Sequence, residues 1–366
     1  MTYITIIGLG VIGGSLGKAI KANQPQIKVT GVDVSMEIIA EAQRSGVIDC
    51  GTDQAAAGVE NADLIFLAVP VAAMPDTCRK IAPFLKEGAI VTDVGSTKEK
   101  IVGLMEEMLP NTVSFIGGHP MAGSEKWGLH GANELLFENA AYILTPTNNT
   151  DLEAVDTVKG IIESLGAKII LLSPAEHDRK VAAVSHLPHL AASALVNTIG
   201  ALEERGHGYF MLAAGGFRDT TRIAAGNSEM WSDILRQNGE ALLPLVTQFI
   251  ESLQEFEQAL RKQDSARLLQ LLTSARNWRE NVPTGLKGML PQLFELNVTV
   301  PDRPGVIAEL SNLLGNNHIN ITDIEIQRVR EQDEGTIRLG FSEEKWRDQA
   351  LKLLHNNGFD VKKSGV

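Results

Sequence analysis

The sequence has little of what marks secreted, membrane-spanning or disulfide-stabilised proteins. It contains only two cysteines, Cys50 and Cys78, in 366 residues, which is too few for a disulfide framework. No apolar run approaches the ~18–20 residues that cross a bilayer, and no basic segment or cleavage site precedes the first strand. Internal repeats and low-complexity tracts are also missing. We therefore expect a protein of the reducing cytoplasm, without a signal peptide or a membrane anchor.

Positive charge is scarce as well. Lysine and arginine total 33 against 45 aspartate and glutamate residues, for a formal net charge of −12. Nonspecific nucleic-acid binding needs a basic surface, so this class of partner is disfavoured. The hydrophobic share of 44% disfavours a disordered chain. An acidic enzyme is expected, in which a few local cations would hold any anionic substrate.

The first part of the chain alternates short apolar runs with amphipathic helical segments. The expected strands are Tyr3–Ile7, Lys28–Val32, Leu64–Val69, Ala89–Val94, Val113–Ile116, Tyr142–Leu144 and Lys168–Leu172. Alternating strands and helices predict an α/β domain with a parallel sheet and helices on both faces. We place this dinucleotide-binding, Rossmann-type domain at residues 1–172.

Two further domains follow. Ser173, Pro174 and Glu176 form a helix start, and the pattern stays helical over residues 173–282, which predicts an all-α substrate and dimerisation domain. Residues 283–291 carry prolines and glycines and read as a linker. Residues 292–366 then give the order βαββαβ, which predicts a small α+β domain.

A glycine motif marks the expected cofactor site. Gly8, Gly10 and Gly13 form the pattern G-x-G-x-x-G between an apolar strand and an amphipathic helix. In this context the glycines permit a tight turn, a close approach of the pyrophosphate and close packing of helix on strand. Asp33 ends the second strand without a following arginine, so its carboxylate favours the ribose hydroxyls of NAD over the phosphate of NADP.

Chemistry-bearing residues follow the later strands, at the edge where such sheets bind ligands. Val69 and Pro70 end one strand, Ser96 follows the next, and His119 stands in a glycine-rich segment after Phe115–Ile116. Histidine exchanges protons near neutral pH, as oxidation of an alcohol by hydride transfer requires. His119 is therefore the candidate catalytic base, with a structural histidine as the alternative.

The helical part adds two further candidates. His186 and His189 have a spacing that could place both on one helix face, but no carboxylate or cysteine cluster accompanies them, so we expect no metal site. Arg218 and Arg222 share a face if their segment is helical. Either guanidinium could bind a carboxylate through two hydrogen bonds, or could form a surface ion pair instead.

Together these segments resemble one family. Gly8–Ser15, Gly95–Lys98, Gly117–Glu125, Ser185–His189 and Gly215–Arg222 are similar to the motifs of prephenate dehydrogenases, in the family's order. The segment Val300–Val306 resembles the start of an ACT domain, the amino-acid-sensing module found in many such enzymes. The resemblance spans nearly the whole chain and is far more specific than the glycine motif alone.

The resemblance implies a reaction and a role for each matching residue. Prephenate would lose hydride to NAD and carbon dioxide to solution, giving 4-hydroxyphenylpyruvate in tyrosine biosynthesis. His119 would accept the hydroxyl proton, Ser96 would orient that histidine and touch the substrate, and Arg222 would bind the substrate carboxylate. The remaining residues implied for the substrate pocket are His189, Glu125, Ser124, Asp219 and Trp231. Those implied for the cofactor are Gly8, Gly10, Ile12, Gly13, Asp33, Val69 and Pro70. Arg218 stands where a relative has lysine, so the resemblance gives it no firm role.

Several alternatives stay open at this point. The substrate could be arogenate, which carries an amino group where prephenate carries a keto group. A β-hydroxyacid dehydrogenase would need a catalytic lysine with an asparagine one helical turn later. Here the residue four positions after Lys180 is Val184, which argues against that family. A sensor that binds NAD and an amino acid without catalysis is a third possibility. We further expect a homodimer, and inhibition by L-tyrosine through residues 292–366.

Overall fold

The computed structural model describes residues 3–123, 128–206, 208–282, 293–301, 303–327 and 334–363. The chain divides into two compact units, Met1–Leu272 and Thr273–Val366. The linker expected at residues 283–291 lies outside the described residues. Among the described residues, no helix is long and apolar enough to cross a membrane.

The first unit is built on an eight-stranded sheet with the strand order β3-β2-β1-β4-β5-β6-β7-β8. The strands are β1 (Tyr3–Ile7), β2 (Lys28–Val32), β3 (Cys50–Thr52), β4 (Leu64–Leu67), β5 (Ile90–Asp93), β6 (Ser114–Pro120), β7 (Ala141–Thr145) and β8 (Lys168–Leu171). The helices that connect them are α1 (Val11–Asn23), α2 (Met36–Arg44), α3 (Ala55–Val59), α4 (Met74–Ile81), α5 (Glu99–Met108) and α6 (Leu152–Ser164). Every strand predicted from the sequence is present.

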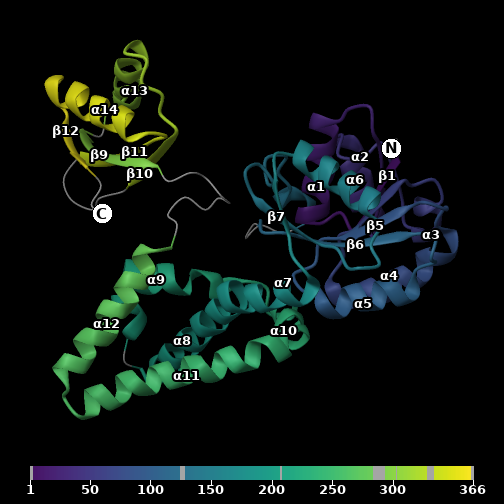
Figure 1. The fold of residues 1–366 in the computed structure, drawn as a ribbon, viewed down its shortest axis with the longest axis horizontal. Helices are drawn as coiled ribbons and strands as arrows, with labels where there is room; N and C mark the ends of the chain where they lie inside the picture. Colours follow the sequence, from purple (N-terminus) through teal and green to yellow (C-terminus); the bar gives the residue numbers. More distant parts are fainter. Residues whose placement is uncertain are drawn as a thin grey trace. The chain divides into compact units, whose positions relative to one another are not determined.

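Helices cover both faces of this sheet, because its strands are apolar on both sides. Helices α1, α2 and α6 pack on one face around residues such as Leu16, Phe66 and Val158. Helices α3, α4 and α5 cover the other face around Ile65, Cys78 and Met105 (Figure 1). The predicted fold class of this part, a Rossmann-type sheet with helices on both faces, is confirmed.

The sheet differs from the prediction in three respects. The short edge strand β3 was not expected, because three residues carry too little periodicity to detect. Strand β7 runs antiparallel to β6, pairing Gly117 with Thr145 and His119 with Ile143, so the sheet is not parallel throughout. Strand β6 also continues through Gly117–Pro120, which places His119 within a strand rather than in the loop after one.

The rest of the first unit is helical. Its elements are α7 (Pro174–Val181), a π-helical turn at Ala182–His186, α8 (Leu187–Glu203), α9 (Gly215–Thr221), a short 3₁₀ turn at Arg222–Ala225, α10 (Ser228–Gln237) and α11 (Gly239–Arg261). Helix α12 (Ser265–Glu280) continues past the boundary between the two units. Ser173 caps α7, because its Oγ accepts a hydrogen bond from the N–H of Glu176. The all-α block predicted after Ser173 is confirmed.

The second unit contains a four-stranded antiparallel sheet with the order β10-β11-β9-β12. Its elements are β9 (Phe294–Pro301), α13 (Val306–Asn316), β10 (Asp323–Gln327), β11 (Glu334–Phe341), α14 (Glu344–Asn356) and β12 (Asp360–Lys363). Leu296, Val298 and Val300 alternate along β9 and pack with Leu310 and Leu354 in one apolar core. The predicted order βαββαβ is confirmed.

Candidate active site

The glycine motif forms the tight turn from β1 into α1. Gly8 has a φ of +97°, and a Cβ there would lie 2.5 Å from the carbonyl oxygen of Ala68. A Cβ on Gly13 would lie 1.9 Å from the carbonyl oxygen of Gly8, so only glycine permits this packing of helix on strand. A Cβ on Gly10 would meet open space. The turn therefore leaves room beside Gly10 for a group that approaches the amino end of α1, as a pyrophosphate does.

Asp33 lies beside this turn, at the carboxyl end of β2. Its Oδ2 accepts a hydrogen bond of 2.9 Å from the N–H of Leu9, and its Oδ1 accepts one of 3.0 Å from the N–H of Ser35. Each carboxylate oxygen has two lone pairs, so acceptor capacity remains for a ribose hydroxyl. Val69 and Pro70 follow β4, which pairs with β1 at the same sheet edge. These residues fit a bound dinucleotide.

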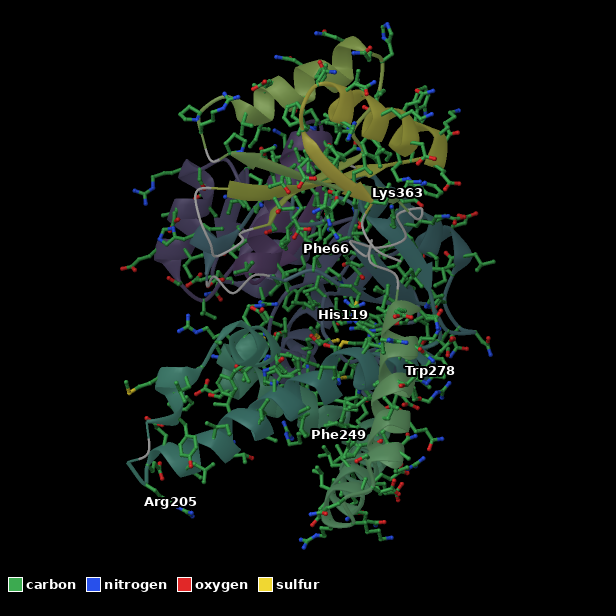
Figure 2. The ribbon with its side chains drawn as sticks, turned by 90° about the vertical axis from the view of Figure 1, so that its left-hand side faces the viewer. Phe66, His119, Arg205, Phe249, Trp278 and Lys363 are labelled. Atoms are coloured by element: carbon green, nitrogen blue, oxygen red, sulfur yellow. The ribbon has the colours of Figure 1, made fainter. Side chains whose placement is uncertain are left out.

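His119 lies near the carboxyl end of β6, where the sheet meets the helical part. In Figure 2 it lies between Phe66 in the sheet core and Phe249 on α11. Its side chain is only 8% exposed. Nδ1 forms a hydrogen bond of 2.8 Å with Nε2 of His177 on α7. Among the described residues, Nε2 of His119 has no hydrogen-bond partner, which leaves it available to a ligand.

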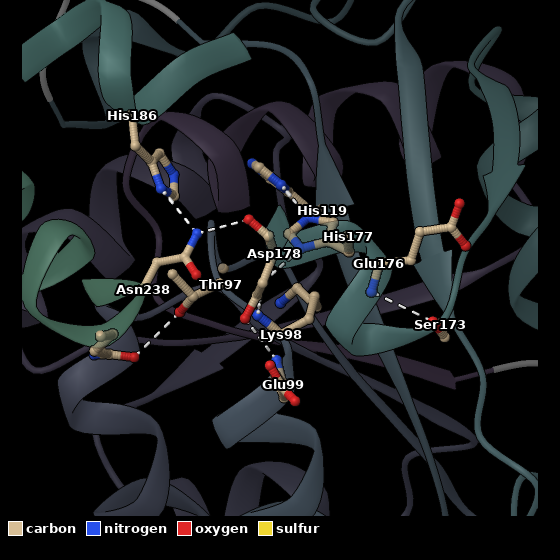
Figure 3. Close-up of polar contacts among 12 residues, drawn as sticks. Thr97, Lys98, Glu99, His119, Ser173, Glu176, His177, Asp178, His186 and Asn238 are labelled. Atoms are coloured by element: carbon tan, nitrogen blue, oxygen red, sulfur yellow. Dashed lines mark hydrogen bonds and ion pairs between the residues drawn. The ribbon is translucent and has the colours of Figure 1, made fainter. Parts of the chain in front are cut away.

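The partner of His119 belongs to a larger hydrogen-bonded chain (Figure 3). Nδ1 of His177 lies 2.7 Å from Oδ1 of Asp178. The Asp178 carboxylate also accepts hydrogen bonds from the backbone N–H groups of Lys98, at 2.8 Å, and Glu99, at 2.9 Å. The start of α5 is thereby fixed to α7, and the Gly95–Lys98 loop is held beside His119.

A buried ion pair supports His119 from the β5 side. Lys98 and Asp93 are both fully buried, and the Lys98 ammonium donates a hydrogen bond to the Asp93 carboxylate. The same carboxylate accepts hydrogen bonds from the N–H of Gly95, at 2.8 Å, and the N–H of Gly118, at 3.0 Å. Asp93 thus connects β5 to the residue that precedes His119.

These surroundings keep His119 uncharged. Burial holds its pKa well below the ordinary value, and the neighbouring His177, Lys98 and His186 lower it further. Asp178 behaves oppositely. Burial alone would raise its pKa, but hydrogen bonds from His177 and the backbone of Glu99 and Lys98 hold the pKa below its usual value. The site therefore combines a neutral imidazole with an ionised carboxylate near neutral pH.

A second cluster of rings lies next to the first. Asn238 donates hydrogen bonds to the carbonyl oxygen of Asp178, at 2.9 Å, and to Nδ1 of His186, at 3.0 Å. The His186 ring meets Trp231 edge-on, and His189 stacks on Trp231 with centroids 3.6 Å apart. His189 is 6% exposed, and neither of its ring nitrogens has a well-formed hydrogen bond within the described residues. Burial lowers the pKa of His189, and the nearby Ile223 carbonyl offsets part of that shift.

The remaining candidates lie around these two clusters. Arg222 begins the short turn next to Ile223, and this turn packs on α8, which carries His189. Asp219 and Arg218 are exposed on α9. Ser96 is half-buried in the loop after β5, but among the described residues it forms no hydrogen bond with His119. Ser124 and Glu125 lie outside the described residues.

Sequence reasoning missed His177, Asp178 and Lys98. Their weak signal was a histidine–aspartate pair in the first helix after the sheet domain. The interaction partners lie 58 and 80 residues away in the sequence, so only the fold shows that they meet. The lysine expected of a β-hydroxyacid dehydrogenase is not part of the site. Lys180 has a side chain that is 59% exposed and pairs with Glu176.

The sheet carries a dinucleotide-binding turn, and a buried neutral histidine lies at the same edge, next to a helical domain. This combination is that of a nicotinamide-dependent dehydrogenase. The chain belongs to the prephenate dehydrogenase family. The family model for the prephenate dehydrogenase nucleotide-binding domain matches residues 16–171, and that for the prephenate dehydrogenase dimerization domain matches residues 173–274. The ACT domain model matches residues 294–344, so the predicted ACT domain is confirmed.

Several relatives show the same likeness. The chain is 38% identical to a prephenate dehydrogenase of Bacillus subtilis, over 96% of this chain and 95% of the relative. It is 36% identical to a cyclohexadienyl dehydrogenase of Zymomonas mobilis, over 73% of this chain and 92% of the relative. A crystal structure of Aquifex aeolicus prephenate dehydrogenase with hydroxyphenyl propionate and NAD+ covers 77% of this chain and 98% of its own, with 35% identity and a TM-score of 0.73.

Proposed function

We propose that this protein oxidises prephenate to 4-hydroxyphenylpyruvate and carbon dioxide, with NAD as the hydride acceptor. The observation that carries the proposal is the state of His119 in a chain of this family. Its imidazole is neutral, its Nε2 is available, and it lies at the sheet edge that also bears the glycine turn and Asp33. Two cysteines without a disulfide partner, Cys50 and Cys78, support a cytoplasmic location.

Each group in the site has its own role in the reaction. Bound NAD supplies the acceptor for the hydride that leaves the hydroxyl-bearing ring carbon. Nε2 of His119 takes the hydroxyl proton as the ring carbon is oxidised. The bond to the ring carboxylate then breaks, its electron pair enters the ring as carbon dioxide leaves, and the phenolate oxygen recovers the proton from His119. Formation of the aromatic ring drives the reaction.

The positioning roles fall to residues around the base. Arg222 binds a substrate carboxylate through its guanidinium. His189 lies beside Trp231, and its ring nitrogens have no well-formed hydrogen bond among the described residues. The indole of Trp231 provides an apolar wall for a six-membered ring. Ser96 contacts the substrate from the Gly95–Lys98 loop. The resemblance to the family supports Glu125, Ser124 and Asp219 as further substrate-binding residues.

Arogenate is the second candidate substrate. A crystal structure of Synechocystis arogenate dehydrogenase shares 33% identity with this chain and a TM-score of 0.66. The two substrates differ only in a side chain that lies away from the reacting carbon, so the chemistry at His119 is the same for both. Production of reduced nicotinamide, followed with each substrate in parallel and with the products identified, tests the proposal. A higher kcat/KM with arogenate would make arogenate the substrate in place of prephenate. Inactivity with both substrates would contradict the proposed function.

The protein is further proposed to act as a homodimer. The helical domain carries many exposed apolar side chains, which are in contact with solvent in the single chain. They include Leu195, Leu243, Ile250, Leu253, Leu260 and Leu269. The family model that matches this region is described as a dimerization domain. The mass in solution, measured for the unmodified chain and for Leu253→Glu, tests this. A dimer that dissociates on substitution is expected, and a monomeric unmodified chain would contradict it.

L-tyrosine is proposed to inhibit through the ACT domain. Gly305 has a φ of +91° and directly precedes α13, and the start of such a helix offers backbone N–H groups to which a carboxylate binds well. Tyrosine must then bind an inactive arrangement of the chain more tightly than the active one.

A further inference from the structure

We infer that His177 and Asp178 are positioning residues that hold His119 in the tautomer whose Nε2 is free to accept the substrate proton. The inference rests on the proposed role of His119 as the base. It assigns a function to two buried residues on α7 that make no contact with the reacting atoms themselves. Their effect is transmitted through the hydrogen bond between His177 and His119.

The direction of each hydrogen bond in the chain is fixed by Asp178. Its carboxylate accepts two backbone N–H groups, from Lys98 and Glu99, and such bonds favour the ionised form. An ionised carboxylate has no proton to donate, so Nδ1 of His177 must be the donor in the 2.7 Å bond to Oδ1. When the His177 ring carries a single proton, that proton is on Nδ1 and Nε2 is bare.

The same reasoning applies to the ring of His119. The bare Nε2 of His177 is an acceptor, so Nδ1 of His119 must donate in the 2.8 Å bond between them. A neutral imidazole carries one proton, and His119 therefore has a lone pair on Nε2. The opposite tautomer would place a proton on Nε2 and leave the base unable to act. Asp178 thus selects the catalytic tautomer through an intervening ring.

The hydrogen-bonded chain from His119 to Asp178 can also persist after proton transfer. Once Nε2 of His119 is protonated, the positive ring still donates from Nδ1 to His177, whose opposite nitrogen donates to Asp178. His177 is fully buried and Asp178 is 4% exposed, so water does not screen this arrangement. The remaining charged or titratable neighbours have other partners. Lys98 bonds to Asp93, and His186 accepts from Asn238, so neither determines which nitrogen of His119 carries the proton.

A double-mutant cycle tests the role. His177→Phe keeps a ring of similar size but removes both hydrogen bonds, whereas His177→Gln retains a carbonyl oxygen that can accept from His119. We expect His177→Phe to lower kcat by about 10²-fold, a share of the 10²–10⁴ that a general base contributes, with KM for prephenate changed less than about threefold. His177→Gln should recover about tenfold of that loss. In a His119→Asn background, His177→Phe should cost less than about threefold, because the base is already missing.

Thr5→Val is the control, because it removes a buried hydrogen bond, from the Thr5 hydroxyl to the carbonyl oxygen of Gly58, that has no connection with His119. Its kcat should change less than about threefold. An equal loss from His177→Phe in both backgrounds would show a merely structural role and overturn the inference. Nitrogen-15 histidine spectra of the full chain supply a test that does not depend on activity. They should show His119 protonated on Nδ1 in the unmodified protein, and protonation on Nε2 would also overturn the inference. Inactivity of the unmodified protein with correct Nδ1 protonation would contradict the proposed function alone.

Discussion

At the scale of single residues, cofactor choice depends on Asp33. Its carboxylate is fixed by the N–H groups of Leu9 and Ser35, and a phosphate on the neighbouring ribose would be repelled. We expect Asp33→Ser combined with Val34→Arg to shift preference from NAD toward NADP. Val34 is 97% exposed, so the arginine has room to reach a phosphate. The ratio of kcat/KM for the two cofactors measures the shift, and an unmodified enzyme that prefers NADP would remove Asp33 from the ribose site.

Carboxylate binding is the second residue-scale prediction. Arg222→Ala should raise KM for prephenate about ten- to a hundred-fold, because a charged hydrogen bond contributes roughly 1.5–3 kcal/mol. NAD binding should stay nearly unchanged, since the glycine turn and Asp33 lie on the sheet. Arg218→Ala, one helical turn earlier and exposed, is the matched control and should change KM less than about threefold. A folded Arg222→Ala variant with normal KM would place this side chain outside the pocket.

At the scale of elements, strand β6 positions the base. A Cβ on Gly118 would lie 2.5 Å from the carbonyl oxygen of Asp93, so Gly118→Ala must displace β6 or β5. We expect it to destabilise the protein by about 1–3 kcal/mol and to lower kcat more than NAD affinity. Gly103→Ala in helix α5 is the control, since a Cβ there meets open space; it should stabilise by about 0.5–1 kcal/mol. Normal stability and turnover for Gly118→Ala would show that this contact does not position His119.

The elements also show where sequence reasoning succeeds. Strands β1, β2 and β4 have strong apolar periodicity and clear ends, and all were predicted, as was the helix start at Ser173. The extension of β6 was not, because Gly117 and Gly118 are poor strand formers that enter the sheet only through pairing with β7.

The residues of the candidate site also differ in how far the sequence alone predicts them. The glycine turn and Asp33 are local in sequence and could be recognised. The contacts of His119 with His177 and of Asp178 with Lys98 depend on the docking of α7 against the sheet, which no local pattern encodes.

At the scale of the whole molecule, regulation should be separable from catalysis. Truncation before Gln292 removes the ACT domain and leaves the first unit, which contains the glycine turn, His119 and Arg222. We expect the truncated enzyme to keep activity and to lose most of its sensitivity to L-tyrosine, measured as the inhibition constant at fixed prephenate. Tyrosine also resembles the product, so it could compete at the active site. Equal sensitivity in the full-length and truncated enzymes would leave that competition as the explanation.

The central claim is that this protein oxidises prephenate with neutral His119 as the base. The most direct measurement is the pH dependence of prephenate-driven NAD reduction, for the unmodified chain and for His119→Asn. Because burial lowers the pKa of His119, activity should persist below the ordinary histidine range and fall only as the pH drops through the lowered pKa. His119→Asn should fold, bind prephenate, turn over about 10²–10⁴-fold more slowly and lack this acidic limb. A folded His119→Asn enzyme with near-normal kcat and the same acidic limb would contradict the account.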